Sequence, residues 1–220
     1  MQFTLAITGA SGAILGREML RLLEADDRVE RVHFVASEPS LRVLMEELGV
    51  SGRNDLIEKL LGAAPKKGAG ASKIVQHCDA DIGAAIASGS YPSDGMIVLP
   101  CSMGTLAKIA NGMADTLIAR AADVALKERR RLVVVPRETP LTQIHLRRLL
   151  ELAEAGATIF PVIPAFYHHP VNTEEMARQF ACRVLAFMGL AQPGAQVWKE
   201  DRKQGTGNRD EHSSGAEENA

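Results

Sequence analysis

The sequence predicts a three-layer α/β fold, in which helices cover both faces of a parallel sheet. Short apolar runs of strand length alternate along the 220 residues with longer stretches whose apolar residues recur at helical spacing. The first run, Phe3–Thr8, leads into a glycine-rich turn and then a helix over Ala13–Glu24. Two later runs, Met96–Leu99 and Leu132–Val135, are apolar throughout, as strands buried on both faces are. This pattern is typical of Rossmann-like or flavodoxin-like domains.

The first turn, Thr8–Gly12, reads TGASG, and a strand, glycine turn and helix together open many nucleotide-binding folds. The glycines let the backbone approach a phosphate, and Ser11 adds a hydroxyl. The dinucleotide fingerprint would need glycine where the chain has Leu15, and Gly16 comes one place late. The second strand ends at Ser37 rather than at an acidic residue that binds a ribose. A tight turn without a ligand is the alternative.

The remaining elements complete the α/β alternation. We expect one domain over residues 1–198 and a disordered tail over 199–220, because the tail has almost no apolar residues. The elements expected in order are a strand over Val32–Ala36, helices over Ser40–Gly49 and Asn54–Leu61, a surface loop over Gly62–Lys73, a strand-like run over Ile74–Ala80, two helices between the buried strands, a helix over Leu141–Ala155, a strand over Thr158–Ile163, and a helix over Glu174–Met188 with Thr173 as its N-cap.

Polar residues follow both central strands directly, after a proline in each case. These are Cys101-Ser102 and Arg137-Glu138, and ligands of open α/β sheets bind outside the carboxyl ends of the strands. Ser102–Thr105 opens a helix, where free N–H groups favour an anion such as phosphate. Arg120 and Lys127 lie two turns apart on one helix face, so we expect them to present cations near the same edge. Phosphate binders, cations and a carboxylate indicate chemistry on a phosphorylated small molecule.

Composition excludes several classes of function. Hydrophobic residues make up 46% and charged residues 24%, and the net charge of −2 gives no reason to expect nucleic acid or an acidic membrane as partner. The odd count of three cysteines indicates a reducing compartment. The N-terminus has no signal-peptide pattern, and no apolar run approaches the roughly 20 residues that span a bilayer. We therefore expect a cytoplasmic protein.

Each candidate charge also has an ordinary structural interpretation. Arg120, Lys127, Arg137 and Arg183 could each be solvated, and their joint placement is what favours phosphate binding. Arg129–Arg131 is interpreted as a solvated helix end.

Three other features are given structural interpretations. Asp26-Asp27 is interpreted as a solvated turn. His168-His169 is not expected to bind a metal, because adjacent residues of an extended chain point to opposite sides and no third ligand has matching spacing. Cys101 is expected to pack beside a helix start, with a nucleophilic role as the alternative.

Three long runs resemble the UbiX-type flavin prenyltransferases, which belong to the flavodoxin-like FMN-binding flavoproteins. They are PCSMGTLAKIANG, ARAADVALKERR and VVVPRETP, and the resemblance covers roughly residues 3–198. It implies that reduced FMN is alkylated by dimethylallyl phosphate without a metal ion, giving prenylated FMN and phosphate. It also implies a homododecamer whose product is passed to a UbiD-type decarboxylase, as in ubiquinone biosynthesis.

The resemblance also assigns residues. It places FMN on Gly9, Ala10, Ser11, Ser37, Ser102, Met103, Gly104, Thr105 and Arg137. It places dimethylallyl phosphate on Lys127, Arg137, Tyr167 and Arg183, with Arg120, Ser88 and Ser90 close by and Trp198 closing the site as a π surface. By the same route Glu47, Glu138, Ser11 and Lys127 are catalytic, with the two glutamates handling protons. The chain departs from the family at Asp81–Gly83, where the family often has an aromatic residue.

Two other functions stay open at this point. One is an FMN-dependent decarboxylase of cysteinyl substrates, which needs a catalytic histidine early in the chain, where only His33 and His77 are candidates. The other is a non-catalytic FMN-binding module. The cations together with Glu138 argue against the second, because flavin storage does not require them.

Overall fold

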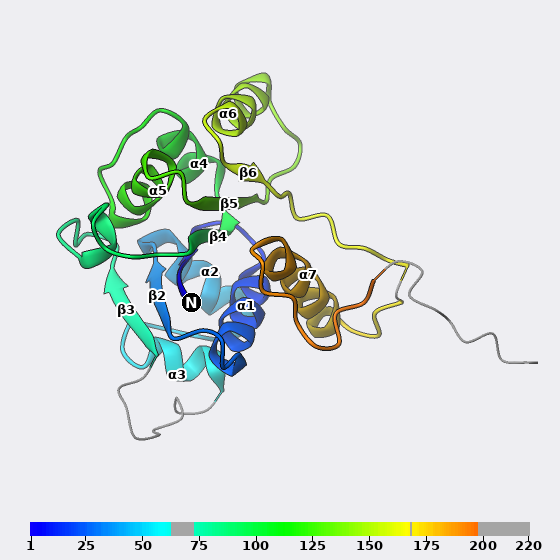
Figure 1. Ribbon diagram of the computed structural model, residues 1–220. Coiled ribbons are helices and arrows are strands. Elements are labelled where there is room, and N and C mark those ends of the chain that lie inside the picture. Colours follow the sequence, from blue (N-terminus) through cyan, green and yellow to red (C-terminus); the bar gives the residue numbers. More distant parts are fainter. Residues whose placement is uncertain (63–72, 168, 198–220) are drawn as a thin grey trace, which may run out of the picture.

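The computed structural model describes residues 1–62, 73–167 and 169–197, and Figure 1 shows their arrangement. Strands and helices alternate along the chain, as the sequence predicts. The elements are β1 Gln2–Ile7, α1 Ala13–Ala25, β2 Arg31–Ala36, α2 Glu38–Leu48, α3 Leu56–Leu61, β3 Ile74–Cys78, the 3₁₀ turn η1 Ala85–Ala87, β4 Gly95–Cys101, α4 Met103–Ala110, α5 Leu117–Lys127, β5 Arg131–Pro136, α6 Gln143–Glu154, β6 Thr158–Ile159 and α7 Thr173–Phe187.

The strands form one six-stranded sheet in the order β3-β2-β1-β4-β5-β6, and every neighbouring pair is parallel. The chain runs outward from β1 through β2 to β3, and then returns to the other side of β1 with β4. The strand order therefore reverses between β1 and β4, which is where open α/β sheets bind ligands. This confirms the predicted parallel α/β fold.

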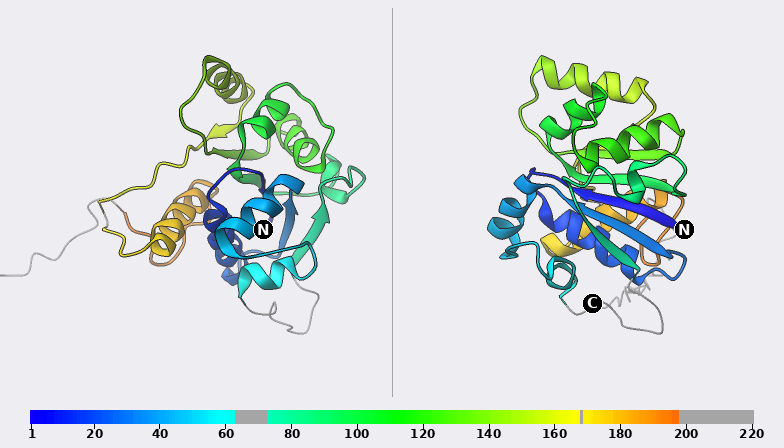
Figure 2. Two further views of the ribbon diagram at one scale, coloured as in Figure 1. Left: turned by 180° about the vertical axis from the view of Figure 1, so that it is seen from behind. Right: turned by 90° about the vertical axis from the view of Figure 1, so that its left-hand side faces the viewer.

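Two apolar cores lie on opposite faces of the sheet. One packs α1, α3 and α7 against side chains that include Phe3, Leu5 and Phe34, all fully buried. The other packs α4 and α5 against alternate residues of the same strands, such as Val98 and Val134. Figure 2 shows the helices on the two sides of the sheet, which gives the three layers. The alternation of side chains across each strand assigns them to the two cores.

Helix α1 lies unusually close to the sheet at Gly16. A Cβ atom at this position would lie 2.6 Å from Cδ1 of Ile7 and 3.0 Å from the carbonyl oxygen of Leu99. Any larger residue would push the helix away from β1 and β4. Gly16 thus has a packing role, one residue later than the dinucleotide fingerprint places its third glycine.

The last part of the chain differs from the prediction. The strand expected over Thr158–Ile163 is regular only at Thr158–Ile159, although the N–H groups of Phe160 and Val162 still donate to the carbonyl oxygens of Val134 and Pro136. The final helix begins at Thr173 and its N-cap is Asn172, whose side chain accepts a hydrogen bond from the backbone N–H of Glu175. The expectation that Thr173 caps this helix is therefore wrong by one residue.

The amphipathic helix expected over Leu141–Ala155 is α6, capped by Thr142, and its apolar residues are mostly exposed. Leu152 is its only buried residue, whereas Ile144 and Leu150 are 66% and 59% exposed. The segment between β6 and α7 likewise exposes Phe166, at 69%. Figure 1 shows this segment running away from the sheet before the chain returns to α7.

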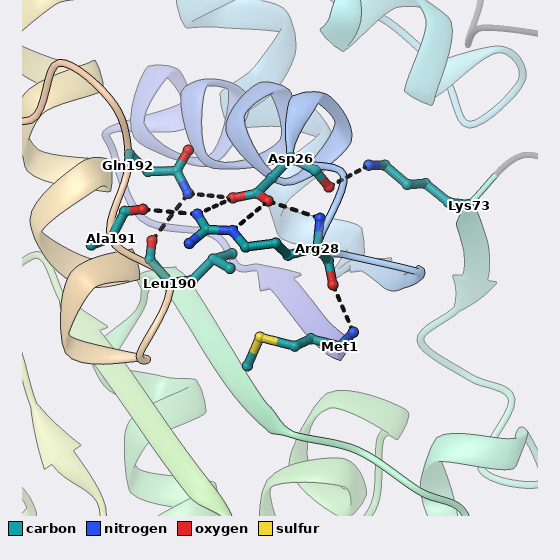
Figure 3. A network of polar contacts seen from close by, with 7 residues as sticks. All are labelled: Met1, Asp26, Arg28, Lys73, Leu190, Ala191 and Gln192. Atoms are coloured by element: carbon teal, nitrogen blue, oxygen red, sulfur yellow. Dashed lines mark hydrogen bonds and ion pairs between the residues drawn. The ribbon is translucent and has the colours of Figure 1, made fainter.

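Asp26 is not the solvated residue expected in the turn after α1. Its carboxylate accepts hydrogen bonds from the guanidinium of Arg28 and from Nε2 of Gln192, both shown in Figure 3. The Arg28 guanidinium holds the pKa of this carboxyl well below its usual range. Because Arg28 also donates to the carbonyl oxygen of Ala191, the network fixes the chain after α7 against the α1–β2 turn.

A buried polar cluster lies on the α5 side of the sheet. His33 of β2 is 4% exposed, with Nδ1 2.8 Å from Nε2 of His77 and Nε2 2.9 Å from the hydroxyl of Tyr91. Burial, with the nearby charges of His77 and Arg31, lowers the pKa of His33 to about 4, and burial also lowers the pKa of His77. Only neutral imidazoles suit this arrangement, since two cationic rings in contact repel each other.

We predict that acid destabilises the protein through His33. An unfolded histidine titrates near pKa 6.5, so between about pH 6.5 and pH 4 the unfolded state binds a proton that the folded state does not. The free energy of unfolding should fall by up to about 3 kcal/mol over this range. Urea denaturation at several pH values measures the loss. His33→Gln, which cannot titrate, should lose much of this pH dependence, and an unchanged profile in that variant contradicts the assignment.

Candidate active site

The site predicted at the carboxyl edge of the sheet forms where the loops after β1 and β4 meet. Thr8, the first residue after β1, is fully buried. Its hydroxyl donates to the carbonyl oxygen of Pro100 at 3.0 Å and accepts from the backbone N–H of Ser102 at 2.7 Å. These bonds place the Gly9-Ala10-Ser11 turn beside Ser102. Thr8 itself was not among the residues expected in the site, although a polar residue at the end of an apolar strand is a usable signal.

The start of α4 is arranged to accept an anion. Ser102 is its N-cap, and the Ser102 hydroxyl accepts from the backbone N–H of Thr105 and donates to its Oγ1 at 3.1 Å. The other N–H groups of a first helical turn have no intrahelical partner. Gly104 is exposed, and a Cβ atom at this position would meet nothing within 4 Å, so a ligand can approach the backbone closely.

Glu47 belongs to α2, and its carboxylate lies against the start of α1, close to the Gly9–Ser11 turn. Its carboxylate accepts hydrogen bonds from the N–H of Gly12 at 3.0 and 3.1 Å and from the N–H of Ala13 at 2.8 Å. The carboxylate thus already satisfies the N–H groups that would bind a phosphate at this helix start. Compared with α1, whose first N–H groups are bound by Glu47, the start of α4 is the better site for a phosphate, and Glu47 binds the N–H of Gly12, the residue after Ser11.

The other residues expected at this edge have mixed roles. Ser37 is buried and caps α2, because its hydroxyl accepts from the N–H of Ser40. Arg137 is exposed just after β5, and its N–H donates to the carbonyl oxygen of Cys101 at 3.2 Å, which places it beside the Ser102 loop. Glu138 is also exposed, and its Oε1 accepts from the N–H of Thr139.

Gly9 owes its presence to packing as much as to a ligand. A Cβ atom on Gly9 would lie 2.6 Å from Cβ of Pro39 in α2. The alternative interpretation of this glycine, a tight turn, is therefore correct in part, because the turn must be narrow for α2 to pack against it.

A second group of predicted residues gathers along α5. The guanidinium of Arg120 donates to the carbonyl oxygen of Ala87 at 3.1 Å, and Lys127 forms an ion pair with Glu128. The hydroxyls of Ser88 and Ser90 are 2.9 Å apart. A Cβ atom added to Gly89, between these serines, would lie 2.5 Å from Nζ of Lys127, so the lysine contacts this turn.

Lys127 does not lie at the carboxyl edge of its own chain's sheet, so the expectation that it does is wrong for a single chain. Helix α5 begins at the carboxyl edge, where the N–H of Leu117 donates to the carbonyl oxygen of Asp79 just after β3. It then runs back toward the start of β5, so its last residue, Lys127, lies toward the amino edge. Arg120, one turn from the start of α5, stays nearer the carboxyl edge.

Tyr167 and Arg183 form a third location. Tyr167 is 39% exposed on the segment between β6 and α7. Arg183 lies on the exposed side of α7 with its guanidinium 6.0 Å from the ring centre of Phe160. Arg183 could either cover an apolar surface or bind an anion, and within a single chain its guanidinium contacts an apolar surface. Trp198, His168, the tail and most of the Gly62–Lys73 loop lie outside the described residues.

Two further interpretations can be compared with the structure. Cys101 is fully buried and burial raises the pKa of its thiol to about 12, which favours packing over a nucleophilic role. Arg130, expected at a solvated helix end, donates to the carbonyl oxygen of Gly89 at 2.6 Å. It therefore helps to hold the Ser88–Ser90 turn.

The family model for flavoproteins matches residues 1–184. A flavin prenyltransferase UbiX from Synechocystis sp. is 44% identical over 202 residues, covering 89% of this chain and 94% of the relative. The chain belongs to the UbiX-type flavoprotein family. This confirms the resemblance seen in the sequence.

Two solved structures of the family superpose on the chain. A dodecameric FMN-dependent UbiX-like decarboxylase from Escherichia coli O157:H7 gives a TM-score of 0.79 at 41% identity, covering 90% of this chain and 99% of that one. A UbiX protein in complex with FMN and dimethylallyl pyrophosphate gives 0.78 at 40% identity, covering 90% and 96%.

Neither a metal cluster nor a membrane span is found in the parts of the chain that the structure describes. Residues 1–62, 73–167 and 169–197 contain no group of three or more His, Cys, Asp or Glu side chains placed to hold a metal ion. Over the same ranges, no helix is long and apolar enough to cross a membrane.

Proposed function

We propose that this protein is a flavin prenyltransferase, which joins a dimethylallyl group from dimethylallyl phosphate to reduced FMN and releases phosphate. The observation that carries the proposal is the pairing of an anion-binding helix start at Ser102–Thr105 with Glu47 and Ser11 at the same strand-order reversal. Membership of the UbiX-type family supports it further, since a relative of 40% identity was solved with FMN and dimethylallyl pyrophosphate.

The residues at the carboxyl edge would hold FMN. The N–H groups at the start of α4, with Ser102 and Thr105, bind its phosphate, and the Gly9-Ala10-Ser11 turn and Ser37 border the rest of the molecule. When bound, reduced FMN supplies the electron-rich ring that takes up the dimethylallyl group. Glu47, which binds the N–H of Gly12 after Ser11, would accept or donate protons at this edge together with Ser11 and with Glu138, two residues after β5.

The positive side chains would hold the phosphate of the allylic donor. Breaking its carbon–oxygen bond leaves an allylic cation and adds negative charge to the phosphate. Fixed Lys127, Arg137 and Arg183 side chains, with Tyr167 and Arg120, would stabilise that negative charge as Mg²⁺ does in other prenyl transferases. Aromatic faces such as Trp198 would stabilise the cation and exclude water.

One chain alone does not bring these charges together, so the proposal includes assembly. Lys127 lies toward the amino edge, whereas Arg137 lies at the carboxyl edge. A neighbouring copy must bring its α5 cations to this site for them to share one phosphate. The E. coli relative is dodecameric, and the exposed apolar residues of α6 and of the segment before α7 offer surfaces for such contacts. We infer a homododecamer here too.

The monophosphate is proposed as donor because it carries less negative charge than a diphosphate. Side-chain cations can balance this smaller charge without a metal ion. The product, prenylated FMN, would serve a UbiD-type decarboxylase, and the reaction would take place in the cytoplasm.

The rival decarboxylase of cysteinyl substrates needs a histidine at the flavin. His33 is instead buried against His77 and Tyr91, and these internal hydrogen bonds occupy its ring nitrogens. The second rival, a storage module for FMN, gives no reason for the cations of α5 to contact the Ser88–Ser90 turn.

We predict that Glu138→Gln retains FMN but loses most prenylation, because the amide cannot exchange a proton. Purified protein is mixed with reduced FMN and either dimethylallyl phosphate or dimethylallyl pyrophosphate, and the flavin spectrum and mass are followed. The wild type should form prenylated FMN, faster with the monophosphate. Glu154→Gln at the end of α6 is the control and should keep full activity. A wild type that binds FMN without changing its mass contradicts the proposed reaction.

We also predict that Lys127→Ala and Arg183→Ala raise the KM for the allylic donor by about tenfold or more, since each removes a charge-assisted hydrogen bond to phosphate. FMN affinity should change little. Lys59→Ala on α3 removes a lysine that donates to backbone carbonyl oxygens and is the control. Donor affinity equal to that of the wild type would mean that Arg183 only covers Phe160.

Assembly gives a third prediction of the proposal. Introducing a charge at Phe166 or Ile144 (Phe166→Asp, Ile144→Asp) should dissociate the oligomer, because both exposed apolar side chains would be buried between copies. Light scattering after size exclusion measures the mass. Ser51→Asp, which adds the same charge between α2 and α3, should stay assembled. If both apolar variants keep the wild-type mass and activity, these surfaces do not form the assembly.

A further inference from the structure

Thr8 makes three hydrogen bonds to the end of β4 and the turn between β4 and α4. It is fully buried, its N–H donates to the carbonyl oxygen of Pro100 at 3.1 Å, and its hydroxyl donates to the same oxygen at 3.0 Å. The same hydroxyl accepts from the N–H of Ser102 at 2.7 Å. One side chain therefore ties the end of β1 to residues more than ninety positions later, across the place where the strand order reverses.

The sequence explains why a side chain has to make this link. The β1–β4 ladder is paired from Phe3 and Gly95 as far as Ala6 and Val98. Pro100 then has no N–H, and the register of β4 against β5 shifts between Val98 and Cys101. One backbone hydrogen bond, from the Thr8 N–H to the Pro100 oxygen, still joins the two segments here, and the Thr8 hydroxyl adds a second donor to that oxygen and an acceptor for the Ser102 N–H.

The link acts directly on the start of α4. The Ser102 N–H bound by Thr8 belongs to the residue whose hydroxyl caps Thr105 and donates to its Oγ1. Ser102 holds an extended backbone with φ −73° and ψ 150°, as an N-cap requires. A shift of Ser102 would move the first-turn N–H groups away from a bound phosphate.

We propose that Thr8 is a positioning residue for FMN: its hydroxyl fixes Ser102, and so holds the first turn of α4 in the geometry that binds the phosphate. This inference rests on the proposed function. Thr8 does not touch the flavin or the allylic donor in this role. Removing the hydroxyl leaves the Pro100 oxygen its bond from the Thr8 N–H, but it leaves the Ser102 N–H without this acceptor.

The test compares Thr8→Val, which has the same shape without the hydroxyl, with Thr8→Ser, which keeps it. FMN dissociation constants are measured on the full-length apoprotein by quenching of flavin fluorescence. Thr8→Val should bind FMN about tenfold more weakly, the loss expected for one buried hydrogen bond and the shift it allows, and Thr8→Ser should stay within about twofold of the wild type. At saturating FMN, the KM for dimethylallyl phosphate should be unchanged in both.

Thr4→Val is the matched control, because Thr4 is a buried threonine inside β1, 3% exposed, four residues before Thr8 and away from this edge. It should keep wild-type FMN affinity. Hydrogen exchange at the Ser102 amide should be faster in Thr8→Val and unchanged in Thr4→Val.

Several outcomes overturn the inference. These are wild-type affinity in Thr8→Val, weakened affinity in Thr8→Ser, which would assign the effect to methyl packing, or an equal loss in Thr4→Val. If Thr8→Val fails to fold, Thr8→Ala, which removes the hydroxyl together with the methyl group, is compared with Thr8→Ser, and equal FMN affinity in these two variants overturns the inference. A wild type that does not bind FMN would instead remove the proposed function.

Discussion

Burial of both faces of the central strands β1, β4 and β5 is the constraint that decides where the loop residues of the site lie. β4 is buried along its whole length, and β1 and β5 are buried in all but their first residue, so these strands have no surface where a ligand could reach a side chain. Chemistry can occur only where the strands end and the backbone turns into helices. The loops after β1, β4 and β5 therefore carry Ser11, Ser102 and Arg137, and the helix starts supply the N–H groups that a phosphate needs.

The sequence could predict those features that depend on local chemistry. Ser102 at a helix start and Arg137 after a buried strand are recognisable from a few neighbouring residues, and both lie where expected. The contact of Glu47 with Gly12 joins positions 35 apart, and nothing local in either stretch shows that α2 packs its carboxylate against α1. Its place beside the first turn was expected only from family resemblance.

The misplaced Lys127 has a different cause. A helix that joins two parallel strands must run back along the sheet, so its first and last turns lie at opposite edges. Helical spacing alone put Arg120 and Lys127 on one face and did not take account of the length of α5 between them. The exposed apolar side chains of α6 show a similar limit. Amphipathic spacing predicts a helix with an apolar face, but it does not say whether that face meets the sheet or another molecule.

Gly16 shows that the close packing of a helix on two strands can require a glycine even where the sequence motif that usually marks this glycine is absent. The helix must touch β1 and β4 at a point where not even a methyl group fits, yet the glycine that permits this comes one residue later than in the dinucleotide fingerprint. A regular-expression search built on that fingerprint would pass over this chain. A search for the close approach of a first helix to two central strands would find it, because steric exclusion does not depend on how many residues the preceding turn contains.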